Sequence, residues 1–213
     1  MARLRFEISM SLDGFIAGPN QSEENPLGEG GMQLHEWIFG LAAWRKRHGE
    51  EGGEVNASTE VVEESLENLG AAVMGRNMFG GDGPWGEDPW DGWWGDDPPF
   101  HMPVFIVTHH AREPVTKEAG TTFTFVTDGI ESALEQAREA AGGKDVALSG
   151  GANVAQQYLT AGLIDEMQLH VVPVLLGDGA RLFDNLGGAE VGLECTRAVE
   201  APGVTHLTYR VVK

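Results

Sequence analysis

Short apolar segments alternate with amphipathic, helix-like segments along this chain, and that alternation restricts the possible folds more than any other feature. Residues 4–12 carry apolar side chains at every second position, a period typical of a strand with one buried face. Similar apolar runs predict strands at 71–75, 103–108, 121–127, 145–149, 167–176 and 204–212. Amphipathic spacing and glycine stops predict helices at 33–47, 60–69, 128–141 and 152–161.

Strands that alternate with helices build a largely parallel sheet with helices on its faces. We therefore expect one three-layer α/β domain over residues 1–213, with a mixed, mostly parallel sheet flanked by helices. The last two predicted strands have no helix between them, so one edge of the sheet should be antiparallel. Residues 79–103 hold six glycines, five prolines and four tryptophans, a composition that predicts a long, packed aromatic loop.

Two of the predicted helices begin at residues that commonly cap helices. Ser58 or Thr59 is placed to cap the helix at 60–69. Asp128 and Glu131 form a capping-box pattern ahead of the alanine-rich helix that ends near 141.

The charge of the chain excludes several classes of partner. Fourteen basic residues face 33 acidic ones, for a net charge of −19, which disfavours nucleic acid and anionic membrane surfaces. The sequence has no apolar run of membrane-spanning length and no signal-peptide pattern near its start, so we expect a cytoplasmic protein. The single cysteine, Cys195, and the absence of paired histidine spacing argue against a disulfide or a metal site.

Three predicted strands end in segments suited to an anion, because each combines backbone freedom with nearby donors. These segments are 75–77 (Gly-Arg-Asn), 108–112 (Thr-His-His-Ala-Arg) and 149–153 (Ser-Gly-Gly-Ala-Asn). Arg76 is the only basic residue among the 64 between Arg47 and Arg112, which include 13 acids. Each segment alone is also compatible with an ordinary turn or a surface ion pair. The segment at 149–153 is neither a Gly-x-Gly-x-x-Gly loop nor a Walker loop.

An ordered set of motifs resembles the dihydrofolate reductase-like superfamily across nearly the whole chain. The closest branch is the reductase domain of the bacterial riboflavin biosynthesis deaminase-reductase, with its stand-alone homologues. The motifs lie at residues 11–17 (SLDGFIA), 73–79 (VMGRNMF), 104–109 (VFIVTH), 149–159 (SGGANVAQQYL), 164–170 (IDEMQLH) and 175–183 (LLGDGARLF).

The resemblance implies NADPH as cofactor, a small-molecule substrate and a homodimer. It implies an adenosine site at Gly75, Arg76, Asn77, Thr108 and His109, with Arg76 facing phosphate. It places the pyrophosphate at Gly150, Gly151, Ala152, Asn153 and Val154, and the nicotinamide beside Ile16 and Ala17. An arginine also suits a phosphate monoester better than a lysine does, because its planar fork donates two hydrogen bonds.

The chain departs from the folate-reducing pattern on its first predicted helix. The resemblance implies a carboxylate three residues before Trp37, but that position is Leu34. Glu36 and Asp13 are the remaining candidates for a catalytic carboxylate, although Glu36 is also compatible with a solvated surface and Asp13 with a plain Asp-Gly turn. Trp37, Asp178 and Arg181 are the candidate substrate contacts, and Arg181 is equally explained by pairing with nearby acids.

We therefore expect an NADPH-dependent reductase that transfers hydride to a small, possibly heterocyclic substrate. By resemblance, its reaction is similar to that of 5-amino-6-(5-phosphoribosylamino)uracil reductase of riboflavin biosynthesis. Two alternatives stay open: a non-catalytic nucleotide-binding or sensing domain, which the absent helix carboxylate favours, and a divergent dihydrofolate reductase with a relocated acid.

Overall fold

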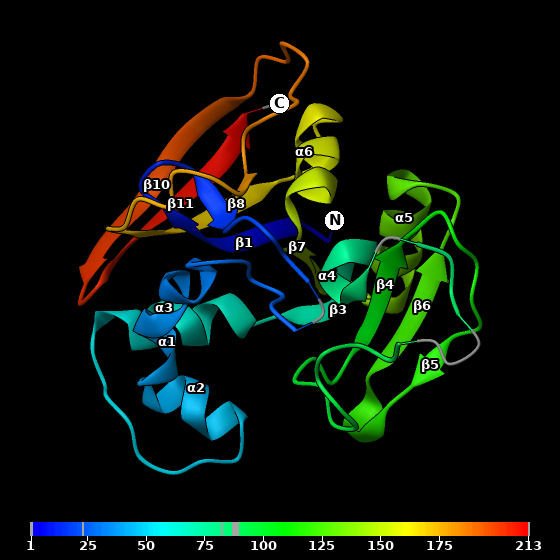
Figure 1. Cartoon of the computed structure of the whole chain (residues 1–213), viewed down its shortest axis with the longest axis horizontal. Coiled ribbons are helices and arrows are strands. Elements are labelled where there is room, and N and C mark those ends of the chain that lie inside the picture. Colours follow the sequence, from blue (N-terminus) through cyan, green and yellow to red (C-terminus); the bar gives the residue numbers. More distant parts are fainter. Residues whose placement is uncertain (1, 23, 82, 87–89, 213) are drawn as a thin grey trace.

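A nine-stranded mixed sheet forms the centre of the molecule, in the order β10-β11-β8-β1-β7-β3-β4-β6-β5 (Figure 1). This computed structural model describes residues 2–22, 24–81, 83–86 and 90–212. The strands of the sheet are β1 (Leu4–Ser11), β3 (Leu69–Gly75), β4 (Pro103–Val107), β5 (Val115–Thr116), β6 (Thr122–Val126), β7 (Asp145–Gly150), β8 (Glu166–Val172), β10 (Gly192–Ala201) and β11 (Val204–Val212). A separate two-stranded ribbon pairs β2 (Phe15–Ala17) with β9 (Ala180–Arg181).

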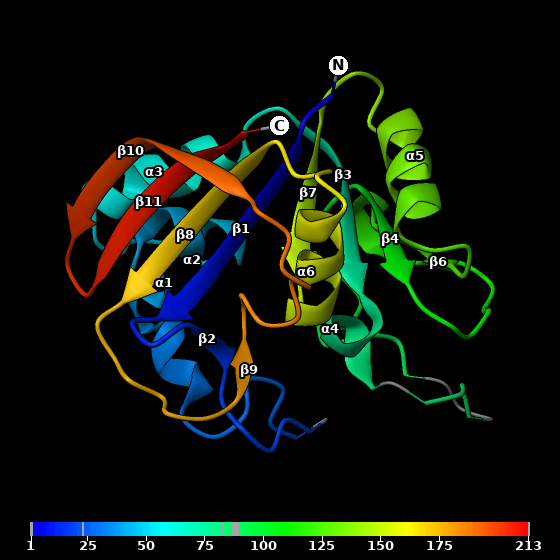
Figure 2. The same ribbon diagram turned by 90° about the horizontal axis from the view of Figure 1, so that it is seen from above.

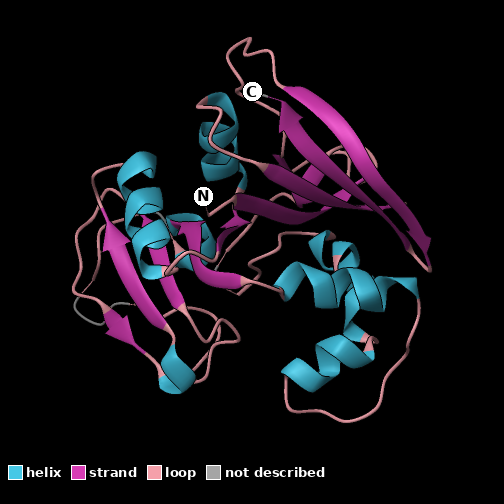
Figure 3. Cartoon of the chain, turned by 180° about the vertical axis from the view of Figure 1, so that it is seen from behind, coloured by secondary structure: helices cyan, strands magenta, loops and turns pink. Residues whose placement is uncertain are grey.

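Helices cover both faces of the sheet, which makes three layers (Figures 2 and 3). Helices α5 (Ile130–Ala140) and α6 (Ala152–Thr160) pack on one face, where they bury Leu4 and Phe6 of β1. The other face carries η1 (Gly31–Leu34), α1 (Glu36–Phe39), α2 (Ala42–Arg47) and α3 (Ala57–Leu66). The expected α/β architecture, with a mostly parallel sheet flanked by helices, is confirmed.

The sequence predicted seven of the nine sheet strands close to their observed bounds. Alternation in β1 buries Leu4, Phe6 and Met10, whereas Leu12 lies beyond the strand and is 66% exposed. β8 ends before Pro173, which has no N–H for a ladder hydrogen bond. The expected antiparallel edge is present, because β11 runs antiparallel to β8.

The sequence missed β10, which lies outside β11 at the edge of the sheet. Most of its residues are exposed, so the strand carries no clear apolar alternation. It is held chiefly by its antiparallel ladder to β11, with which it forms a hairpin across Pro202 and Gly203.

The continuous helix expected at 33–47 is wrong. The segment forms three short pieces, η1, α1 and α2, because Gly40 ends α1 and Leu41 is extended, with φ −72° and ψ 138°. The Leu41 segment pairs instead with a later loop: Ala42 N–H donates to the Glu54 carbonyl, and Glu54 N–H donates to the Gly40 carbonyl. Tertiary hydrogen bonds therefore replace helical ones at the break.

Both predicted helix caps are also wrong. α3 begins at Ala57, and Asn56 caps it in a capping box with Thr59, so Ser58 and Thr59 lie within the helix and are buried. α5 begins after Gly129, and no described side chain caps it. Among the described residues after α4 (Arg76–Gly80), no helix or strand occurs before β4, as the composition of the aromatic loop predicted.

Candidate functional site

The three strand ends singled out from the sequence lie side by side. β7, β3 and β4 are parallel neighbours in the sheet. Met74 pairs with Gly150 across β3 and β7, and Gly75 pairs with Val107 across β3 and β4, directly before Thr108. The order of the strands therefore brings their glycine-rich and polar ends to one edge of the sheet, where ligands of open α/β sheets bind.

Gly75 allows β3 to approach the first turn of α6. A Cβ added at Gly75 would lie 2.8 Å from Val154 Cγ2, which is closer than side chains normally approach. Gly151 is the N-cap of α6, and no described side chain caps that turn, so no side-chain acceptor occupies the first amides of the helix. Val154 is buried and Asn153 is exposed, its Oδ1 accepting from Gln157 at 2.6 Å.

Arg76 follows β3 and stacks on the aromatic loop. Its guanidinium carbon lies 3.6 Å from the centre of a Trp85 ring, and Arg112 lies 4.8 Å from that indole. The indole also packs edge-on against Phe125, and its N–H donates to the His110 carbonyl at 3.0 Å. Trp85 therefore gathers two arginines, from separate strand ends, at the edge of the sheet predicted to bind adenosine.

The remaining residues of the predicted adenosine site differ in exposure. Asn77 and His109 are exposed, and Thr108 is buried. Thr108 directly follows β4, and its Oγ1 accepts from His110 N–H at 3.1 Å.

Ile16 and Ala17, predicted to line the nicotinamide site, are buried in β2. β2 pairs with β9, which contains Arg181, and the Arg181 guanidinium lies 4.9 Å from the Phe15 ring. Gly179 allows the segment before β9 to lie close to β2: its φ is +127°, and a Cβ there would lie 2.1 Å from the Ala17 carbonyl oxygen. Arg181 and its ion-pair partner Asp184 are both exposed.

Asp13 ties the loop after β8 to the end of β1. Its carboxylate accepts hydrogen bonds from Ser11 Oγ at 2.6 Å, Leu176 N–H at 3.1 Å and Gly177 N–H at 2.8 Å. The Ser11 hydrogen bond is the main cause of a lowered pKa at Asp13, and the two amides add to it. The exposed Asp178 follows in the same loop and accepts from Gly179 N–H.

A cavity of about 290 Å³ opens on the face of the sheet that carries α2 and α3. Ser149 at the end of β7 and Met78 of α4 line it, so it reaches the proposed cofactor edge. Most of its wall is apolar and aromatic, from Trp44, Trp94 and Phe100. The polar groups include Glu7 on the sheet and Arg47 on α2.

A chain of hydrogen bonds leads from this cavity into the protein. Glu7 Oε1 lies 2.8 Å from His170 Nε2, His170 Nδ1 lies 2.7 Å from His206 Nδ1, and His206 Nε2 lies 2.9 Å from Ser58 Oγ. The two imidazoles and Ser58 are almost completely buried. A carboxylate can only accept, so His170 Nε2 is the donor in its hydrogen bond with Glu7.

Burial and neighbouring groups shift the pKa values of two members of this hydrogen-bond chain, Glu7 and His206. Burial raises the pKa of Glu7, but the hydrogen bond and charge of His170, with help from Ser65 and Arg5, outweigh it and leave the pKa below its ordinary value. Burial, followed by the charge of His170, lowers the pKa of His206 to about 4. At neutral pH the chain therefore ends in an ionised carboxylate and holds a neutral His206.

The sequence reading missed Glu7, His170 and His206 because alternation in β1 assigned the polar face to solvent. That face instead meets the helical layer and the cavity. The available signal was the cross-strand pattern: polar residues occupy the same face in β1, β8 and β11.

Trp37 packs on the buried histidines, outside the cavity lining. Its ring centre lies 4.8 Å from that of His170 and 5.0 Å from that of His206, and its N–H donates to Ser9 Oγ at 3.2 Å. Glu36, the neighbouring candidate, is exposed and does not line the cavity. Leu34 is fully buried, so the position where the resemblance implies a carboxylate is part of the core.

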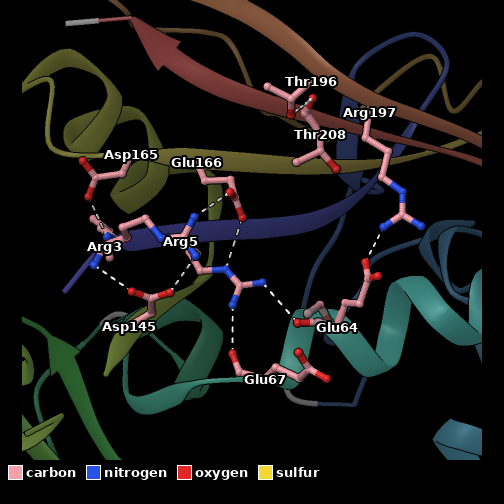
Figure 4. Close-up of polar contacts among 12 residues, drawn as sticks. Arg3, Arg5, Glu64, Glu67, Asp145, Asp165, Glu166, Thr196, Arg197 and Thr208 are labelled. Carbon is pink, nitrogen blue, oxygen red and sulfur yellow. Dashed lines mark hydrogen bonds and ion pairs between the residues drawn. The ribbon is translucent and has the colours of Figure 1, made fainter. Parts of the chain in front are cut away.

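A network of ion pairs includes Arg5 and Glu166, which line the cavity near the starts of β1 and β8 (Figure 4). Arg5 of β1 pairs with Glu166 at 3.2 Å. It also donates to two backbone carbonyls at the C-terminal end of α3, those of Glu64 in the last turn and Glu67 directly after it. Arg197 of β10 pairs with the Glu64 side chain. These contacts hold α3 over the sheet, and a cation at a helix C-terminus is favourable there.

The fold is that of a dihydrofolate reductase-like α/β protein, with glycine-rich strand ends near a cavity. The family model described as the RibD C-terminal domain matches residues 2–207. The chain therefore belongs to the RibD C-terminal domain family. Because this family comprises reductase domains, membership indicates that the protein is an oxidoreductase. Among the described residues, no helix is long and apolar enough to cross a membrane. No cluster of three or more metal-ligating side chains occurs in that part of the chain.

Relatives of known sequence or structure agree with this fold. The chain is 29% identical over 92 residues to the uncharacterised protein YyaP of Bacillus subtilis, a match that covers 41% of this chain and 48% of that relative. A Shewanella sp. PV-4 protein assigned provisionally to riboflavin biosynthesis has a TM-score of 0.62 and 23% identity, with both chains fully covered.

Two further structures have the same fold at lower identity. The riboflavin biosynthesis reductase Rib7 of Saccharomyces cerevisiae has a TM-score of 0.56 and 13% identity, covering 99% of this chain and 90% of its own. Dihydrofolate reductase from Enterococcus faecalis, solved with NADP(H), has a TM-score of 0.51 and 12% identity, covering 99% and 97%.

Proposed function

We propose that this protein is an NADPH-dependent reductase that transfers hydride to a small, flat heterocyclic substrate bound in the 290 Å³ cavity. The observation that carries the proposal is the meeting of three predicted anion-binding strand ends at one edge, with the cavity directly beside it. The neighbouring structures of a riboflavin biosynthesis reductase and of an NADP(H)-bound dihydrofolate reductase support it.

The residues at this edge fit a dinucleotide. Uncapped amides at the start of α6 suit a pyrophosphate, and Gly75 lets that helix turn lie against β3. Arg76 and Arg112 suit a phosphate and a flat base, because guanidinium groups bind both. Ile16 and Ala17 offer a buried apolar surface for the nicotinamide.

The bound cofactor would supply the hydride, and the protein would position the substrate and exclude water. Aromatic walls suit a flat ring of modest size, since the cavity lies near the lower end of the usual range for ligand sites. Within this proposal the substrate resembles the aminopyrimidines of riboflavin biosynthesis. Catalytic roles for Asp13 and Glu36 stay predictions.

Calorimetry with NADPH and absorbance at 340 nm with aminopyrimidine, pterin and carbonyl substrates test the proposal. We expect micromolar NADPH binding and substrate-dependent loss of absorbance. Failure to bind NADPH would refute the proposed function, and tight binding without turnover on this panel would favour a nucleotide-sensing domain.

Arg76→Ala tests the cofactor edge separately. If Arg76 contacts the 2′-phosphate, the variant should bind NADPH about 10 to 100 times more weakly, since a charge-assisted hydrogen bond contributes about 1.5–3 kcal/mol, with NADH affinity nearly unchanged. Arg76→Lys should recover part of the loss. Equal losses for both cofactors would remove this role from Arg76.

A further inference from the structure

Three charged side chains of the sheet line the cavity: Arg5, Glu166 and Glu7. Arg5 and Glu166 pair with each other at 3.2 Å, whereas Glu7 pairs with the buried His170. The Glu7 side chain is 37% exposed, while its partner His170 is only 3% exposed. Because Glu7 lines the cavity and His170 does not, the carboxylate keeps one side toward the cavity and the other toward the buried histidine.

Buried hydrogen bonds hold Glu7 in this position from behind. Its Oε1 is 2.8 Å from His170 Nε2, and His170 is braced by His206 and by the Trp37 ring. A carboxylate held in this way has little rotational freedom to lose when a ligand binds. Such pre-organised acceptors give more binding energy per hydrogen bond than mobile surface carboxylates do.

Arg47 supplies the complementary donor on the wall formed by α2. Burial lowers the pKa of Arg47 and the charge of Glu7 opposes this, so the two charges act on each other. Arg47 is held by hydrogen bonds to the Pro99 carbonyl. The rings of Trp44, Trp94 and Phe100 line the same cavity as the two charged groups.

We propose that Glu7 is the specificity-determining residue of this cavity: its carboxylate accepts hydrogen bonds from the N–H groups of a flat, uncharged ring that directs carbonyl groups toward Arg47. This inference rests on the proposed function, because it concerns the substrate of the same reductase site. It places the recognising carboxylate on β1, far in sequence from the helix where the resemblance implied one.

The cavity's chemistry excludes several other ligands. A negatively charged group that faced Glu7 would be repelled by its carboxylate. A purely apolar ring would give Glu7 and Arg47 no hydrogen bonds, which is costly in a desolvated site. A neutral ring with N–H on one edge and C=O on another satisfies both groups.

6-Aminouracil is a suitable probe, and 1,3-dimethyl-6-aminouracil is its matched control because the methyl groups remove both ring N–H donors. Binding is measured without cofactor, by titration monitored on the indole N–H signals of ¹⁵N-labelled protein. The signals of Trp44 and Trp94 should shift, since both rings line the cavity. The dimethyl compound should bind the unmodified protein at least tenfold more weakly.

Glu7→Gln tests the residue itself. Glutamine retains an oxygen that accepts from His170 but loses the charge, so the fold should survive, as near-ultraviolet circular dichroism would verify. We expect 6-aminouracil to bind about 10 to 100 times more weakly, as for loss of a charge-assisted hydrogen bond, with little change for the dimethyl compound. Glu63→Gln, at an exposed position of α3, is the matched control and should bind like the unmodified protein.

These outcomes separate this inference from the proposed function. Equal binding of the two rings to the unmodified protein, or unchanged 6-aminouracil binding in Glu7→Gln, would overturn the role of Glu7 even if NADPH binds and turns over. Glu7-dependent binding in a protein that does not bind NADPH would support the role of Glu7 and refute the reductase.

Discussion

Replacing Gly75 by alanine should destabilise the junction between β3 and α6 on steric grounds alone. The backbone at Gly75 has φ −79° and ψ 156°, which alanine adopts freely. The added Cβ would lie 2.8 Å from Val154 Cγ2, whereas ordinary contacts begin at 3.4 Å. Val154 is buried and β-branched, so it has little freedom to move away.

Overpacking of this kind costs about 1–3 kcal/mol, and the lower entropy of the unfolded alanine chain offsets up to about 1 kcal/mol. We therefore expect Gly75→Ala to lower the free energy of unfolding by about 1–2 kcal/mol. Val154→Ala removes the obstructing methyl groups, so adding Gly75→Ala to that variant should cost almost nothing. The coupling energy of the double-mutant cycle should be at least about 1 kcal/mol.

Urea unfolding followed by tryptophan fluorescence measures all four proteins of the cycle. Gly40→Ala is the control: no described atom lies within 4 Å of its added Cβ, and its φ of −79° suits alanine. It should stay within about 0.5 kcal/mol of the unmodified protein. The steric account fails if Gly75→Ala is as stable as the unmodified protein, or if Val154→Ala does not relieve its cost.

Three further changes test other parts of the structure. The pKa of His206 is lowered to about 4, so the folded protein does not take up the proton that the unfolded chain binds below about pH 6.5. Between pH 7 and 5 the free energy of unfolding should therefore fall by about 1–2 kcal/mol more in the unmodified protein than in His206→Asn. Urea unfolding measures this, and equal losses in the two proteins would contradict it. Asn56→Ala removes the cap of α3 and should cost about 1 kcal/mol, whereas an unchanged unfolding midpoint would show that the cap is dispensable. NADPH should change the fluorescence of Trp85, which contacts Arg76, and Trp85→Phe should remove that part of the signal; an identical response in the variant would show that the cofactor does not reach Trp85.

The segments of the proposed cofactor edge were predictable from local sequence patterns. Glycines and polar residues directly after buried strands predicted three anion-binding segments, and parallel pairing brings all three together. Their shared position follows from a general property of parallel sheets, which place every carboxyl end at the same edge. The role of each residue there is a proposal that cofactor binding will test.

The substrate side could not be read in the same way. Glu7, His170 and His206 are separated by up to 199 positions in sequence and meet only because β8 lies between β1 and β11. Alternation in β1 marks Glu7 as polar but does not state whether that face meets water or other residues. The helix break at Leu41 has the same origin, since its hydrogen bonds go to a loop more than ten residues away.

The sequence by itself determined the α/β class, most of the strands and the glycine-rich strand ends, because these follow from local periodicity and backbone preference. Tertiary structure decided which polar face is covered, where the cavity lies and which charged side chains line it. Those properties depend on the lateral order of strands and on the seating of α1–α3 over the sheet. Strand order and helix seating are set by long-range packing, and a single strand's pattern carries no information about its neighbours.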